Sequence, residues 1–192
     1  MRIVWLFFMA KKKLGLTKLG RPPRQPVMPT TKQLKGLSIE TRVIGGFPLH
    51  VVSSPIPSER CVVYLHGGGY VQRSAKQHWD VIGKIARETS ATVFVPRYGL
   101  ASRHNVDDAL GFLELVRHEV ASLGLPVIIA GDSAGGGLAL TIAQQSSWQQ
   151  MTNRLILIAP WIDSEWNYED FGIYERRDPW LLPQSLRYIA IV

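Results

Sequence analysis

The sequence has 192 residues, of which 46% are apolar and 19% are charged, and this composition excludes a disordered, collagen-like or coiled-coil chain. The length suits roughly one domain with a core of its own. Its single cysteine, Cys61, cannot close a disulfide within the chain, and no apolar stretch is long enough for a membrane-spanning helix. We therefore expect a globular domain with a cytoplasmic location.

The positive charge of the chain is confined to its N-terminal part. Residues 1–39 hold nine Lys or Arg and no acid, whereas the remainder carries 13 basic and 15 acidic residues. We predict a basic arm over residues 1–36, in which an apolar run at 3–10 forms a short helix that packs on the body. A secretory signal and a peripheral membrane contact of the arm are alternatives. Nucleic-acid binding is not expected, because no recognised binding fold or aromatic stacking motif accompanies the charge.

From residue 37 onward the sequence predicts strands first and then strands alternating with helices. Two short strands, at 40–44 and 48–53, flank a Gly45-Gly46 turn. Residues 61–65 form a continuous apolar run, which is typical of a strand buried on both faces. The elements predicted after this run are a helix over 75–89, a strand over 91–95, a helix over 106–122, a strand over 126–130, a helix over 134–146 and a strand over 154–159.

This alternation predicts an α/β fold with a mostly parallel sheet flanked by helices. Functional residues of such sheets gather at the carboxyl ends of the strands. The strand at 61–65 runs directly into His66-Gly67-Gly68-Gly69-Tyr70, and the strand at 126–130 runs into Gly131-Asp132-Ser133-Ala134-Gly135. We therefore expect these two segments to form one site.

The second segment is a G-x-S-x-G motif between a predicted strand and a predicted helix. At such a sharp turn the serine hydroxyl stands clear of the sheet, and flanking glycines avoid clashes. Ser133 is thus the candidate nucleophile, and the N-terminus of the following helix favours a developing oxyanion beside it. The simpler interpretation of Ser133 is an ordinary helix N-cap.

The first segment places three glycines in succession after a strand. Backbone N–H groups in such a loop can face a substrate without obstruction by side chains. A plain tight turn and a phosphate-binding loop are the alternatives, although the G-x-x-x-x-G-K-[ST] pattern of phosphate loops is absent. We interpret His66, with Gly67, as structural support for this loop and not as a catalytic base.

Together the two motifs resemble the hormone-sensitive-lipase-like branch of the α/β-hydrolases, which contains many carboxylesterases and acetyl esterases. The resemblance extends over about residues 37–190, with further weak matches at 98–104, 107–109 and 159–163. It implies that Ser133 attacks an ester and that the backbone amides of Gly68, Gly69 and Ala134 form the oxyanion hole. It also implies a small-molecule ester substrate, with no metal and no organic cofactor. Ser102-Arg103 replaces the family's Pro-Glu, so the wall of the acyl pocket is expected to differ.

The general base is the missing part of this catalytic set. In this fold the triad acid and histidine follow the serine, whereas every histidine of this sequence precedes Ser133: His50, His66, His78, His104 and His118. Asp178 follows the serine but lies at the approach to a helix predicted over 181–191. We therefore expect residues 37–192 to be an incomplete α/β-hydrolase domain that lacks its last strands, the triad acid and the triad histidine.

Two consequences follow from this expectation. Loss of the base predicts negligible esterase activity, with His104 as the best internal substitute because it follows a strand end. The strand at 154–159 would then lie at an uncovered apolar edge of the sheet. The alternative function is a non-catalytic protein that binds a small ligand or a partner on a hydrolase scaffold. The oligomeric state is left open.

Overall fold

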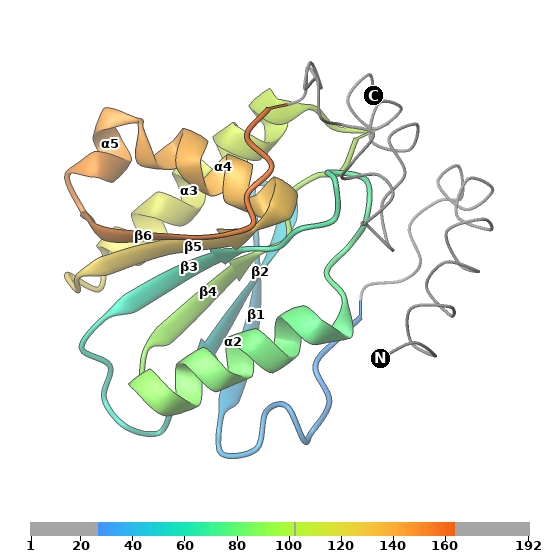
Figure 1. Ribbon diagram of the computed structural model, residues 1–192. Coiled ribbons are helices and arrows are strands. Elements are labelled where there is room, and N and C mark those ends of the chain that lie inside the picture. Colours follow the sequence, from blue (N-terminus) through green and yellow to red (C-terminus); the bar gives the residue numbers. More distant parts are fainter. Residues whose placement is uncertain (1–26, 102, 164–192) are drawn as a thin grey trace, which may run out of the picture. The chain divides into compact units, whose positions relative to one another are not determined.

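The computed structural model describes residues 27–101 and 103–163. The chain divides into two compact units, and the sheet with its helices belongs to the unit Arg24–Ile162. The described residues of this unit form a six-stranded sheet with helices on both faces (Figure 1). The predicted α/β architecture is therefore confirmed.

The sheet has the strand order β1-β2-β4-β3-β5-β6. Strands β3 to β6 are parallel to one another, and β1 and β2 add an antiparallel hairpin beside β4. Gly45 and Gly46 both have positive φ in the hairpin turn, as a two-residue turn of this kind requires. Every strand ends within two residues of its predicted bounds: β1 (Ser38–Ile44), β2 (Phe47–Ser53), β3 (Cys61–Leu65), β4 (Thr92–Pro96), β5 (Val127–Asp132) and β6 (Thr152–Ile158).

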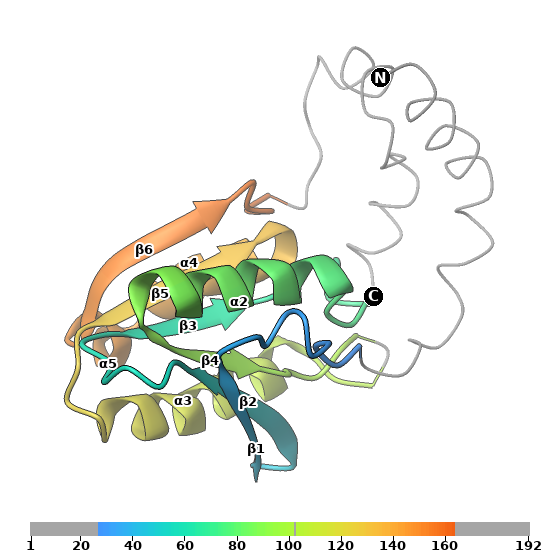
Figure 2. The ribbon, with the colours of Figure 1, turned by 90° about the horizontal axis from the view of Figure 1, so that it is seen from below.

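The helices lie in two layers. Helix α2 (Lys76–Thr89) covers one face, while α3 (Val106–Ala121), α4 (Ser133–Ala143) and α5 (Ser146–Gln149) cover the other. Figure 2, seen from below, shows α2 in front of the sheet. The predicted helix over 134–146 is shorter than expected, because the chain ends α4 and turns into α5, which fully buries the Trp148 side chain.

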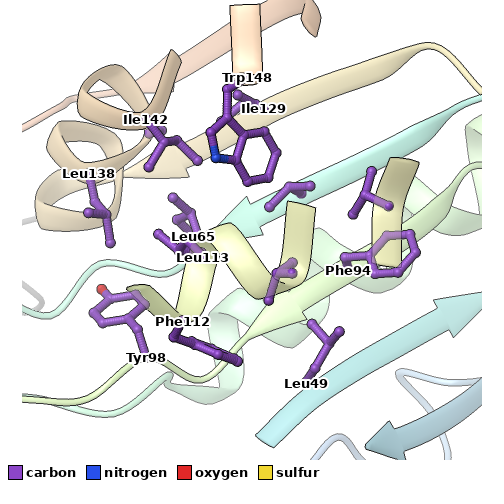
Figure 3. Close-up of a cluster of buried hydrophobic side chains, with 14 of the residues drawn as sticks. Leu49, Leu65, Phe94, Tyr98, Phe112, Leu113, Ile129, Leu138, Ile142 and Trp148 are labelled. Atoms are coloured by element: carbon purple, nitrogen blue, oxygen red, sulfur yellow. The ribbon is translucent and has the colours of Figure 1, made fainter. Parts of the chain in front are cut away.

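The core consists of two apolar clusters separated by the sheet. On the α3 and α4 side, Phe112, Leu113, Leu138 and other side chains pack against the strands (Figure 3). On the α2 side, Trp79, Ile82 and Ala86 pack against strand residues of the opposite face. Strand β3 contributes to both clusters, which confirms that its continuous apolar run reflects burial on both faces. Its first residue, Cys61, is fully buried, and burial raises the pKa of its thiol to about 11.

Residues 27–36, predicted as the end of the basic arm, contact α2 through polar groups. The indole Nε1 of Trp79 donates to the Val27 carbonyl oxygen at 2.6 Å. The Gln33 amide donates to the Lys76 carbonyl oxygen at 2.9 Å and to the Asp80 carboxylate at 2.8 Å. Residues 1–26 of the predicted arm lie outside the described residues, so its apolar helix and its membrane contact stay predictions.

Strand β6 lies at one end of the strand order. Among the described residues it pairs with β5 alone, and Ile156 and Ile158 are 47% and 45% exposed. This agrees with the expectation of an apolar edge for the part of the chain that the structure describes.

Alanine substitutions at two helical glycines should change the stability of the protein in opposite directions. A Cβ on Gly111 in α3 would meet open space, whereas one on Gly135 in α4 would collide with the Leu65 carbonyl oxygen. Gly111→Ala should raise the free energy of unfolding by about 0.4–1 kcal/mol through helix propensity. Gly135→Ala should lower it by about 1–3 kcal/mol through overpacking. Urea unfolding of both variants measures the difference, and equal effects would contradict the close packing of α4 on β3.

Candidate active site

Ser133 lies at the junction of β5 and α4 in a strained backbone conformation. Its φ is +48°, a left-handed value that is uncommon for a residue other than glycine. The turn is tight enough that a Cβ on Gly131 would contact the Gly135 carbonyl oxygen. The sharp strand-to-helix turn predicted around the serine is thus present, with the half-buried Ser133 as its first helical residue.

The loop after β3 lies at the same edge of the sheet. Strands β3 and β5 are neighbours, and Leu65 pairs with Gly131 where both strands end. Gly68 and Gly69 adopt φ values of +137° and +60°, and the Gly68 carbonyl oxygen accepts hydrogen bonds from the Val71 and Gln72 amides. The glycine loop and the start of α4, with Ala134 buried behind Ser133, are therefore brought together as the sequence predicts.

Asp132, one residue before the serine, joins the two segments. Its Oδ1 accepts hydrogen bonds from the Tyr64 hydroxyl at 2.9 Å and from the Gly67 amide at 3.0 Å. Its Oδ2 lies 3.2 Å from Nε2 of His78. Since Nδ1 of His78 accepts the Ala75 amide at 2.7 Å, the ring proton is on Nε2, which donates to Asp132.

The charge of Asp132 is stabilised by these donors. Burial raises the pKa of its carboxyl, but the hydrogen bonds from His78, Tyr64 and the Gly67 amide outweigh burial and hold the pKa below its usual value. The sequence patterns predicted no role for Asp132, Tyr64 or His78. The one available signal was that Tyr64, the penultimate residue of β3, and Asp132, the last residue of β5, lie near the carboxyl ends of neighbouring strands.

His66 lies beneath the glycine loop. It is 1% exposed, and its Nδ1 donates to the Gly67 carbonyl oxygen at 2.9 Å. Its ring stacks on Tyr98 with 4.7 Å between centroids, and the Tyr98 hydroxyl donates to the His66 carbonyl oxygen. Burial lowers the pKa of His66 to about 4. A neutral, enclosed imidazole of this kind suits the predicted bracing role.

The other histidines have partners away from Ser133. His104 lies 3.3 Å from Asp108 and packs edge-on against Phe47, and the exposed His118 lies beside Glu114. His50 bonds to the Thr41 hydroxyl. All five histidines of the sequence are among the described residues, and none is hydrogen bonded to the Ser133 hydroxyl. Asp178 and Ser102 lie outside the described residues.

Aromatic residues stand beside the serine. The Trp161 amide donates to the Ser133 carbonyl oxygen at 2.8 Å, and the Trp161 and Tyr70 rings lie 5.9 Å apart. Tyr70 follows the glycine loop directly. The weak sequence match at 159–163 thus corresponds to a segment in contact with the turn at Ser133.

The described residues contain neither a metal-binding cluster nor a membrane span. No group of three or more His, Cys, Asp or Glu side chains suited to a metal ion occurs in residues 27–163 outside residue 102. Within the same part of the chain, no helix has the length and apolar character needed to cross a bilayer.

Comparison with known proteins identifies the scaffold. A family described as having the alpha/beta hydrolase fold matches residues 62–190, which is more than half of the chain. The chain belongs to the α/β-hydrolase fold family. This assignment confirms the resemblance drawn from the glycine loop and the serine turn.

The relatives of this α/β-hydrolase are esterases and lipases. It is 34% identical over 184 residues to a Mycobacterium tuberculosis protein that bears the name acetyl-hydrolase LipR, with 91% of this chain and 59% of LipR aligned. An esterase of Gibberella moniliformis is 30% identical over 143 residues, with 70% and 44% aligned. The crystal structure of an esterase from the bacterial hormone-sensitive lipase family superposes with a TM-score of 0.69 at 25% identity, covering 81% of this chain and 55% of that one.

The α/β-hydrolase therefore lies in the hormone-sensitive-lipase-like, esterase- and lipase-type branch of its family. The chain spans about half the length of the relatives it matches.

The three donors of Asp132 lead to a stability prediction. Asp132→Asn should lower the free energy of unfolding by about 1–3 kcal/mol at pH 7, because the amide NH₂ must face one of these buried donors. Urea denaturation measures the change. Glu88→Gln is the matched control, since this exposed acid on α2 makes one weak ion pair and should cost less than about 0.5 kcal/mol. Equal losses in both variants would contradict the network.

The buried histidines His50 and His66 predict that the free energy of unfolding depends on pH. Burial lowers the pKa of both His66 and His50 to about 4, and the charge of Arg97 contributes at His50. The unfolded chain binds a proton at each near pH 6.5, so stability should fall as the pH decreases from about 6.5 toward 4, by about 1.4 kcal/mol per pH unit for each histidine.

Urea unfolding between pH 7 and pH 5 measures this slope. His50→Gln should remove about half of it, while His118→Gln at an exposed site should leave it unchanged. A flat profile for the unaltered protein would mean that neither imidazole is buried in its neutral form.

Proposed function

We propose that this α/β-hydrolase is the scaffold of a serine carboxylic-ester hydrolase in which Ser133 is the acyl-accepting nucleophile. The observation that carries the proposal is the left-handed φ of +48° at Ser133, adopted where β5 meets α4 and beside the Gly68-Gly69 loop. Strain of this kind persists at a site where the surrounding structure enforces it. It supports a serine placed for attack over a serine that merely caps a helix.

The proposed reaction is acyl transfer followed by hydrolysis. The Ser133 oxygen attacks the ester carbonyl carbon and loses its proton to a base, and the alcohol then leaves. The negative oxygen of the tetrahedral intermediate is met by the backbone amides of Gly68, Gly69 and Ala134, and by the N-terminal end of α4. Water finally cleaves the acyl-serine ester and releases the acid. The acetyl-hydrolase name of LipR suggests acetyl esters as the first substrates to test.

The proposed activity of the 192-residue chain by itself is weak. Each histidine is engaged elsewhere, and none is hydrogen bonded to the Ser133 hydroxyl. Loss of the base from a serine triad costs about a millionfold in turnover, while the oxyanion hole and binding retain about 10³–10⁴ over water. A second candidate function, a non-catalytic protein that binds a small ligand beside the glycine loop and Ser133, is favoured by the same absence of a histidine bonded to the serine.

Hydrolysis of p-nitrophenyl acetate by the purified chain and its Ser133→Ala variant tests the proposal. Both should show rates near background, because none of the five histidines is hydrogen bonded to the Ser133 hydroxyl. Peptide mass spectrometry after long incubation should nevertheless find acetyl on Ser133, since this serine is the one aligned for attack. Absence of that adduct, together with a ligand that binds both proteins equally, would favour the binding protein.

A fast reaction would be equally informative. If the rate is high and is lost in Ser133→Ala, then a base reaches the serine, and His104→Ala tests the substitute suggested by the sequence. A high rate that persists in Ser133→Ala would refute acyl transfer at this residue.

A further inference from the structure

Arg97 is a nearly buried cation on the α2 side of the sheet. It follows β4 directly, is 7% exposed, and its amide donates to the Pro48 carbonyl oxygen at 2.9 Å, which continues the β2–β4 ladder. Side chains alternate along a strand. Arg97 therefore points to the same face as Val95, which belongs to the cluster packed under α2.

The sheet register places Arg97 beside the start of α2. His50 pairs with Val95, and its ring lies 5.5 Å from the Trp79 ring, so Trp79 is level with Val95. Arg97 lies two residues, or about 7 Å, further toward the carboxyl edge. Helix α2 starts at this edge, and Ala75 lies about 6 Å before Trp79 along its axis. The Arg97 side chain is thus level with the N-terminus of the helix.

Among the described residues, Arg97 has no ion-pair partner at this place, and the carboxylate that does reach the first turn of α2, that of Asp132, is bonded to His78. Ala75, the N-cap, has no side-chain acceptor, and the first turn of α2 contains no acid. Arg73 and Lys76 flank the helix start. No described carboxylate forms an ion pair with Arg97, and the oxygens of Asp132 are already bonded to three donors. Burial and the nearby charge of Arg73 lower the pKa of Arg97 to about 10.

Ser74, which directly precedes the N-cap of α2, carries a buried hydroxyl that makes no hydrogen bond to the described residues. The Ser74 hydroxyl is in a residue that is 1% exposed, and it has no hydrogen-bond partner. Buried polar groups and buried cations are unfavourable unless they are paired. The amides of Ala75 and His78 are already bonded, so the helix start offers those of Lys76 and Gln77. A guanidinium, a hydroxyl and two such amides are donors that suit a small oxyanion.

We propose that Arg97, Arg73, Ser74 and the N-terminus of α2 form a binding site for a phosphate or carboxylate group. Arg97 supplies the charge-assisted hydrogen bonds from the sheet side, and the helix supplies amides from the other. The site differs from the proposed oxyanion hole, whose amides belong to the Gly68-Gly69 loop and α4. Its occupation does not depend on ester hydrolysis.

Titration of the 192-residue chain with inorganic phosphate, and separately with succinate, tests the site. Sodium chloride keeps the ionic strength constant, and thermal unfolding and calorimetry report binding. One of the two anions should raise the unfolding temperature saturably, and the tighter ligand distinguishes a phosphate from a carboxylate site. Arg97→Met should weaken binding about tenfold or more and Ser74→Ala about fivefold. Arg60→Met, at an exposed arginine before β3, should bind as the unaltered protein does.

A second measurement separates a binding role from a structural one. Without added oxyanion, Arg97→Met should unfold at a higher temperature than the unaltered protein, because it removes an unpaired buried charge. Arg97→Lys, which keeps the charge, should keep part of the binding. The proposal is overturned if neither anion has an effect beyond that of chloride, if Arg97→Met binds normally, or if Arg97→Met is the less stable protein.

Discussion

The Asp132 carboxylate is the constraint on which the geometry of the candidate site depends. It accepts one hydrogen bond each from the end of β3, from the glycine loop and from α2. Because Asp132 precedes Ser133 directly in the chain, the contacts that fix the Asp132 side chain also fix Ser133 relative to the glycine loop. The link continues outward, since α2 is itself held by residues 27–36. The position of Ser133, the proposed nucleophile, thus depends on polar contacts made far from it.

Local signals in the sequence were sufficient for the architecture and for the two halves of the site. The apolar run of β3 reflects burial on both faces of the sheet. The Gly45-Gly46 turn and the glycines around Ser133 reflect local backbone conformations that only a few residue types adopt easily. For this reason the strand bounds and the placement of the motifs at one sheet edge could be predicted. Family membership followed from the same residues.

Other features of the structure could not be predicted, because they depend on contacts between residues far apart in the chain. Asp132 meets Tyr64 across 68 residues and His78 across 54, and no pattern in either segment indicates the partner. The lack of an ion-pair partner for Arg97 among the described residues likewise cannot be predicted until β2, β4 and α2 are placed together. Helix α5 was missed because burial of Trp148, a tertiary effect, ends α4 before its helical pattern does. From its charge, the segment 27–36 was predicted to be part of a basic arm. Its contacts with α2, however, are made by the Val27 backbone and the Gln33 side chain, neither of which is charged.

Cys61 gives this protein a built-in reporter. It is the single cysteine of the sequence, it is fully buried at the start of the central strand β3, and burial holds its thiol in the unreactive protonated form. A thiol reagent can therefore modify the chain only when the middle of the sheet opens. The alkylation rate of the unaltered protein measures how often that opening occurs, without any introduced label.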